Sequence, residues 1–186
     1  MKTASIVFTL GIGAAMSAAP SMAADTLIQF DGGIGVIPVS SGQGQDPTAT
    51  TVNRNIVRTV QPPGQIWVIK DLKADVRAGG AITVNGKGLL LGGGSNIGGN
   101  ANQSVFATLI CEPTAPFTLR NTNTSGVALA PDGDFRIDDV LNPAPSDCAS
   151  PVLLIRNLAG AWFAAGIPKR SEREPDSSQM RSPFGL

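Results

Sequence analysis

The sequence predicts an all-β protein, folded as a single-domain antiparallel β-sandwich, with a closed β-barrel as the alternative. Short runs rich in Val, Ile, Thr and Phe recur along the chain, and Gly, Pro, Asn and Asp interrupt them at short intervals. About ten such runs, with turn signals between nearly every pair, are typical of a sandwich or a barrel. A membrane-spanning barrel is a weaker third alternative, because two Trp and no Tyr supply few residues for its aromatic girdles.

Residues 1–23 are predicted to be a signal peptide. Lys2 provides a positive start, Ala4–Ala19 is small and apolar, and a small-x-small cleavage site ends at Ala23. We therefore expect an exported, soluble protein with a periplasmic or extracellular location. No later stretch approaches the ~20 apolar residues of a membrane span, so no transmembrane helix is expected.

Residues 24–168 are predicted to form the single folded domain, a length that can bury a substantial core. After Pro168 the composition shifts to charged, Ser and Pro residues. Segments of this kind bury too little apolar surface to fold, so residues 169–186 are predicted to be a disordered polar tail.

The first part of the domain is predicted to open with a hairpin. Leu27–Phe30 and Ile34–Val39 are apolar runs that flank the turn signal Asp31-Gly32-Gly33. Ser40–Thr50 has the composition of a loop. Val52–Val60 is rich in Val, Thr and Asn and ends before Pro-Pro-Gly, which favours a strand.

Gln65–Ala78 is predicted to be one long strand. Its even positions are apolar almost throughout, whereas its odd positions begin with Trp67 and Ile69 and then carry alternating charges. Successive side chains of a strand point to opposite faces. We therefore expect this strand to start buried on both faces and to finish with one face in water.

Glycines mark the next turns. Gly79-Gly80 and Asn85-Gly86 predict tight turns around the strand Ala81–Val84, and Gly88–Leu91 is expected to follow as the next strand. The glycine-rich segment 92–100 is predicted to be a plain connection, because it lacks the Gly-Lys-Ser/Thr and the following helix of a phosphate-binding loop.

The rest of the domain is predicted to consist of strands and hairpins. The turn signals are Pro131-Asp132-Gly133 and Leu158-Ala159-Gly160. The predicted strand segments are Val105–Cys111, Phe117–Asn121, the hairpin Val127–Ile137, Val152–Arg156 and Ala161–Ile167.

The two cysteines, Cys111 and Cys148, are predicted to form a disulfide. An even count in an exported chain favours a bridge, because the compartment is oxidising. The competing interpretations are a reactive thiol or metal thiolates. The chain contains no His, so a Cys-His nucleophile cannot be built, and two thiolates make only half of a zinc site.

Composition also limits the possible functions. Without His or Tyr, the side chains that most often run acid-base chemistry near neutral pH are largely missing, so we do not expect an enzyme. Basic and acidic residues number 14 each, and no basic block is present. A nucleic-acid partner is therefore not expected.

The densest acidic segment offers a candidate metal site. Asp132, Asp134 and Asp138, followed by Asp139, could supply oxygen ligands to calcium. The competing interpretation is turn chemistry with a solvated strand edge, which the Asp-Gly pair favours. No other cofactor is expected.

Two further interpretations concern glycans. A carboxylate pair can hydrolyse glycosides without His, and Glu112 could join such a pair. Trp67 and Trp162 could stack on sugars, although each lies in an apolar run that favours the core. The leading hypothesis is an exported, non-enzymatic binding or structural protein with a protein or carbohydrate partner, and a carboxylate-dependent glycan hydrolase is the alternative.

Overall fold

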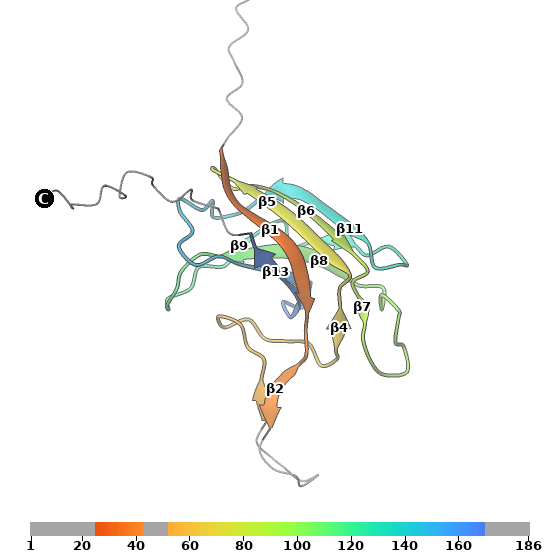
Figure 1. Cartoon of the computed structure of the whole chain (residues 1–186). Coiled ribbons are helices and arrows are strands. Elements are labelled where there is room, and N and C mark those ends of the chain that lie inside the picture. Colours follow the sequence, from red (N-terminus) through yellow and green to blue (C-terminus); the bar gives the residue numbers. More distant parts are fainter. Residues whose placement is uncertain (1–24, 43–51, 170–186) are drawn as a thin grey trace, which may run out of the picture.

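The chain folds into antiparallel sheets. The computed structural model describes residues 25–42 and 52–169, and no helix occurs in these ranges (Figure 1). None of the described segments forms a helix long and apolar enough to cross a membrane. The all-β prediction is confirmed. The strands are β1 (Thr26–Gly35), β2 (Val39–Gly42), β3 (Val52–Arg54), β4 (Trp67–Val68), β5 (Asp71–Arg77), β6 (Ala81–Lys87), β7 (Leu90–Leu91), β8 (Ser104–Ile110), β9 (Arg120–Asn121), β10 (Val127–Ala128), β11 (Phe135–Val140), β12 (Val152–Asn157) and β13 (Trp162–Pro168).

Nine strands form one sheet in the order β10-β8-β12-β13-β1-β5-β6-β11, with β9 paired to β8 as well. The sheet curls until its two end strands, β10 and β11, lie next to each other, so it is nearly closed. The ribbons β2-β3 and β4-β7 form two small separate sheets. The nearly closed sheet is compatible with both the sandwich and the barrel that the sequence predicts.

The core lies inside this curled sheet. In β5 and β6 alternate residues are buried, as the sequence predicts for the second half of Gln65–Ala78. β8 is buried on both faces over Val105–Ile110. The second face is covered because the chain between β3 and β4 packs there, where Val57 and Val60 join the core cluster and the Trp162 amide donates to Gln61 O (3.0 Å).

Two predicted turns are instead parts of strands. Asp31-Gly32-Gly33 is a bulge inside β1, where the pairing with β13 shifts register between Phe30 and Gly33. Asn85-Gly86 lies within β6, opposite Arg136 and Phe135 of β11. A Cβ at Gly86 would overlap the Phe135 ring, so this glycine serves core packing and not a turn.

The predicted strand Gln65–Ala78 is divided into β4 and β5. β4 leaves the main sheet and pairs with β7, and the Lys70 amide then donates to Lys87 O (2.9 Å) at the start of β5. The break reverses the expected alternation, because Trp67 is buried and Ile66 and Val68 are exposed. Periodicity within one continuous segment cannot reveal such a reversal.

The sheet closes along a seam between residues 121–130 and 134–142. One end is pinned by Asn121 and Asn142, whose backbone groups exchange hydrogen bonds of 3.0 and 2.8 Å. The other end is the β10-β11 hairpin, where the Ala130 amide donates to Asp134 O (2.9 Å). Between these points β10 and β11 are not paired. Asp139 bridges the gap instead, because its Oδ2 accepts from the Asn123 amide (2.7 Å) and its Oδ1 from the Val140 amide (2.8 Å).

The predicted turn Pro131-Asp132-Gly133 forms the tip of the β10-β11 hairpin. The Gly133 amide donates to Ala130 O (2.8 Å), and Gly133 has a φ of 81°. A Cβ at Gly133 would lie 2.6 Å from the backbone N and O of Leu89, which itself donates to Gly133 O (3.0 Å). Both the backbone conformation and the close approach therefore require glycine here.

Three glycine-to-alanine variants test this packing. Gly64→Ala meets nothing within 4 Å and should change the free energy of unfolding little. Gly79→Ala also meets nothing but has a φ of 88°, so it should cost about 1–2 kcal/mol. Gly133→Ala has the same strain from a positive φ and also overlaps the backbone of Leu89, so it should lower the free energy of unfolding more than Gly79→Ala does. Urea unfolding measures all three, and equal costs for the last two would contradict the tight approach to Leu89.

Candidate functional site

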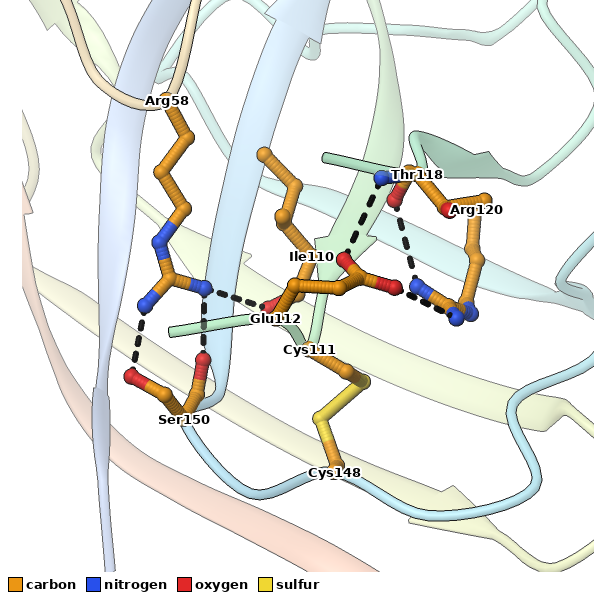
Figure 2. Close-up of a disulfide and its surroundings, with 8 residues drawn as sticks. All are labelled: Arg58, Ile110, Cys111, Glu112, Thr118, Arg120, Cys148 and Ser150. Carbon is orange, nitrogen blue, oxygen red and sulfur yellow. Dashed lines mark hydrogen bonds and ion pairs between the residues drawn. A yellow bond between two sulfur atoms is a disulfide. The ribbon is translucent and has the colours of Figure 1, made fainter. Parts of the chain in front are cut away.

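Cys111 and Cys148 form the predicted disulfide, with an S–S distance of 2.06 Å and a sequence separation of 37 (Figure 2). Cys111 directly follows β8, and Cys148 precedes β12, the neighbour of β8 in the sheet. The Ser150 amide donates to Cys111 O (3.0 Å) beside the bridge. Closing a loop of this length stabilises a fold by roughly 3–4 kcal/mol in the chain-entropy model.

Arg58 fastens the chain between β3 and β4 to this disulfide-linked end of the sheet. Its Nη1 donates to Ile110 O (3.1 Å) and Ser150 O (2.6 Å), and its Nη2 donates to Ser150 Oγ (2.6 Å) (Figure 2). Its Cζ also lies 5.7 Å from the centroid of the Phe117 ring. A single guanidinium therefore joins three parts of the chain that are distant in sequence.

The turn that presents Arg58 departs from the strand predicted for Val52–Val60. Val57 and Val60 exchange backbone hydrogen bonds, and the two residues between them, Arg58 and Thr59, have φ values of 44° and 73°. Turns of this type usually contain Gly, Asn or Asp. Sequence reasoning missed the turn, because Arg and Thr carry no signal for positive φ.

Glu112 lies beside the disulfide in an ion pair with Arg120. The Glu112 Oε1 lies 2.8 Å from Arg120 Nη2, and its Oε2 accepts from the Thr118 amide (3.2 Å) (Figure 2). The hydrogen bond from Arg120 is the main cause that lowers the pKa of Glu112 to about 2. A general acid needs a raised pKa, so this environment does not suit Glu112 to the role of an acid in a glycan hydrolase.

The acidic segment is occupied by hydrogen bonds of its own. Asp132 Oδ1 accepts from the Asp134 amide (3.1 Å) within the hairpin tip, and Asp134 Oδ1 accepts from the Gly88 amide (3.0 Å). Asp138 lies on β11, where Arg136 Nη2 (3.1 Å) and Thr83 Oγ1 (3.2 Å) donate to it. The hydrogen bond from Arg136 is the main cause that lowers the pKa of Asp138.

Calcium binding receives no support from this geometry. Across residues 25–42 and 52–169, no group of three or more His, Cys, Asp or Glu side chains is arranged to hold a metal ion. The contacts of Asp132 and Asp134 are those of turn and loop residues, which agrees with the competing interpretation of this segment. A calcium site stays a prediction of the sequence alone.

Both tryptophans belong to the core. Trp67 and Trp162 are only 4% and 3% exposed. The Trp67 ring stacks on Phe163 with centroids 4.0 Å apart, and Trp162 Nε1 donates to Asn55 O (2.9 Å). The core interpretation is confirmed, and neither ring offers a surface for sugar stacking.

An exposed apolar patch, here named the apolar end, lies where the two small ribbons meet the main sheet. Backbone and side-chain hydrogen bonds bring its segments together: the Trp67 amide donates to Val36 O (3.1 Å), and Asn55 Nδ2 donates to Ile37 O (3.1 Å). Figure 1 shows β2 and β4 at the same end of the molecule. Its members are Ile37, Val39, Ile56, Ile66 and Val68, exposed by 60, 39, 48, 40 and 48%.

Comparison with known proteins gives no relative: no protein-family model, no curated protein and no solved structure matches the chain. A functional proposal therefore rests on the residues and contacts described above.

Arg58→Ala should destabilise the fold by about 2–3 kcal/mol, because the carbonyls of Ile110 and Ser150 lose a charged donor. Arg58→Lys, which keeps the charge but not the planar fork, should fall between the wild type and Arg58→Ala. Arg77→Ala is the matched control, since this side chain is 55% exposed. Urea unfolding compares the variants, and equal stability of Arg58→Ala and Arg77→Ala would contradict the proposed clamp.

The ion pair of Glu112 predicts a pH dependence. A carboxyl with a lowered pKa contributes stability that is fully present above its unfolded pKa, near 4.5, and is lost as the pH falls through about 2. Glu112→Gln should therefore be less stable than the wild type at pH 6, by about 1 kcal/mol or less for a partly exposed pair.

The measurement is chemical unfolding of the wild type and Glu112→Gln at pH 6 and near pH 2. The difference between the two proteins should shrink at the lower pH, where the wild-type carboxyl becomes protonated. A difference that stays constant would show that the charge of Glu112 contributes nothing.

Proposed function

We propose that the chain is an exported, non-enzymatic binding protein that contacts a partner protein through its apolar end. The observation that carries this proposal is the gathering of five exposed aliphatic side chains from three separate segments. Single exposed apolar residues are ordinary, whereas contiguous patches mark interaction sites. Ile37 and Val39 come from the connection between β1 and β2 and the start of β2, Ile56 from the segment after β3, and Ile66 and Val68 from β4 and the residue before it.

The chemistry of the apolar end defines the kind of partner. The segments Ile34–Val39 and Gln65–Ile69 contain no charged residue, whereas the exposed Arg54 lies opposite Val39 in the β2-β3 ribbon and adds a positive charge at the border. The cores of protein interfaces are depleted in charge in the same way. The partner is therefore a protein with a largely apolar surface of its own.

The pKa values of the carboxylates agree better with a binding protein than with a glycan hydrolase. A glycan hydrolase requires a carboxyl group whose pKa is raised. Glu112 and Asp138 both have lowered pKa values, because Arg120 and Arg136 hold them in the charged form. The buried Trp67 and Trp162 likewise leave no aromatic platform for a glycan substrate.

Two features support the exported location. Residues 1–23 have the pattern of a signal peptide, and the Cys111–Cys148 bridge agrees with an oxidising compartment. Mass spectrometry of the protein from its own source checks this part of the proposal, and a mature chain that begins at Ala24 is the expected result.

The partner is tested by placing a photo-cross-linking amino acid at Ile66 in cells that export the protein. The expected result is one discrete cross-linked protein, whose purified form binds the purified chain in calorimetry. Ile37→Ser and Val68→Ser should each weaken that binding about 10-fold. Val140→Ser is the matched control, because Val140 is a 56% exposed valine on β11, outside the apolar end.

Two outcomes would overturn the proposal. Cross-linking to a second copy of the chain alone would assign the apolar end to self-association. Binding that Ile37→Ser and Val68→Ser weaken no more than Val140→Ser does would place the contact elsewhere on the molecule.

A further inference from the structure

The outer face of β1, β5, β6 and β11 carries two complete rows of polar side chains, here named the polar rows. Strand register aligns the members of each row across all four strands. The first row is Gln29, Asp75, Thr83 and Asp138, and the second is Asp31, Lys73, Asn85 and Arg136. The row between them, which is Phe30, Ala74, Val84 and Ile137, is buried in the core.

Contacts within the polar rows are concentrated at their two sides. On the β1 side, Gln29 Nε2 donates to Asp75 Oδ2 (2.9 Å), and Lys73 Nζ lies 3.8 Å from Asp31. On the β11 side, Arg136 Nη1 donates to Asn85 Oδ1 (2.9 Å). In the middle, between the β5 and β6 members of either row, no side-chain hydrogen bond is formed in the described structure.

A groove of about 250 Å³ lies over the β1, β5 and β6 members of the polar rows. Its lining includes Gln29, Asp31, Lys73, Asp75, Thr83 and Asn85. Lys169 lies at the groove as well, because its amide donates to Gln29 O (2.8 Å) just after β13. The groove is smaller than the roughly 300–1,000 Å³ of sites for drug-sized ligands, so it fits one small unit of a ligand.

The groove offers interleaved donors and acceptors. The carboxylate of Asp31, which is 58% exposed, is the acceptor that a ligand can reach, whereas Asp75 Oδ1 is buried and lies 3.6 Å from Arg77 Nε. Asn85 Oδ1 already accepts a hydrogen bond from Arg136 Nη1, so the side-chain amide nitrogen of Asn85 is the group left to donate to a ligand. The ammonium groups of Lys73 and Lys169 add further donors.

These features favour a neutral, hydroxyl-rich ligand. Asp31 is paired with Lys73 and Asp75 with Arg77, so neither carboxylate presents an unbalanced charge to a ligand. A hydroxyl group both donates and accepts, which matches donors and acceptors that alternate at the ~5 Å spacing of strands. A sugar ring carries several hydroxyls at neighbouring positions.

We propose that this groove binds one unit of a neutral saccharide, at a site separate from the apolar end. Without an aromatic side chain to stack on the ring, hydrogen bonds supply the affinity. Each net hydrogen bond contributes only about 0.5–1.5 kcal/mol, so the dissociation constant lies in the millimolar range.

NMR titration of the isotope-labelled, disulfide-bonded protein tests this inference. The probes are maltose, cellobiose, lactose and N,N′-diacetylchitobiose. At least one should give saturable shifts in the amides of β1, β5 and β6. Lys73→Met and Asp31→Asn should each weaken binding about fivefold, the loss of one hydrogen bond. Lys87→Met is the matched control, because Lys87 is exposed on β6 outside the groove.

The outcomes separate this inference from the proposed function. Ile37→Ser should leave the saccharide shifts unchanged, because the groove does not include the apolar end. The inference is overturned if no disaccharide gives saturable shifts in these amides. It is also overturned if Lys73→Met, whose side chain is 63% exposed and cannot disrupt the core, binds as the wild type does. Saturation of the same amides by phosphate or calcium instead would assign the groove to an ion.

Discussion

The main sheet closes along the seam between residues 121–130 and 134–142, and the arrangement of the outer surfaces depends on that closure. The strands on either side of the seam do not pair with each other between the Asn121–Asn142 bridge and the hairpin at Ala130 and Asp134. Between these points the carboxylate of Asp139 crosses the seam, because its Oδ2 accepts from the Asn123 amide while its Oδ1 accepts from the amide of the next residue, Val140.

Because the sheet is nearly closed, the protein has one core and several outer surfaces that differ in their side chains. β1, β5, β6 and β11 turn their apolar residues inward and leave the polar rows in water. β8 and β12 are buried on both sides; the disulfide joins their ends, and Arg58 fastens the covering segment between β3 and β4 to them. The ribbons β2-β3 and β4-β7 lie outside the curled sheet and carry the apolar end. The proposed saccharide groove therefore lies on strands of the main sheet, and the apolar end lies on and beside the strands that are left out of it.

Much of this fold could be predicted from local sequence signals. The β10-β11 hairpin, the β5-β6 turn at Gly79-Gly80, the core strand β8 and the final hairpin each combine turn residues with an apolar run. The disulfide could be predicted because only two cysteines exist. Asn85-Gly86 misled the prediction, since a glycine needed beneath an aromatic ring resembles a turn glycine in the sequence.

The functional surfaces could not be predicted, because they depend on contacts between distant segments. The apolar end appears only after the break at Ile69 and Lys70 turns Ile66 and Val68 outward. The charged side chains of β5 were expected to face water. Their alignment with polar side chains of β1, β6 and β11 could not be predicted, because it depends on the register between these strands. The role of Arg58 in fastening the chain could not be predicted, because its side chain is presented by a turn with positive φ, which the residue type Arg does not favour.

The Asp139 bridge across the seam is tested most directly by residue-resolved hydrogen exchange of the wild type and Asp139→Ala. In the wild type the amides of Asn123 and Val140 should be protected, and in Asp139→Ala their exchange should accelerate at least about 10-fold. The amides of Asn121 and Asn142, which bond to each other's carbonyls, should keep their protection in both proteins. If Asn123 and Val140 exchange equally fast in the two proteins, the carboxylate does not bridge the seam.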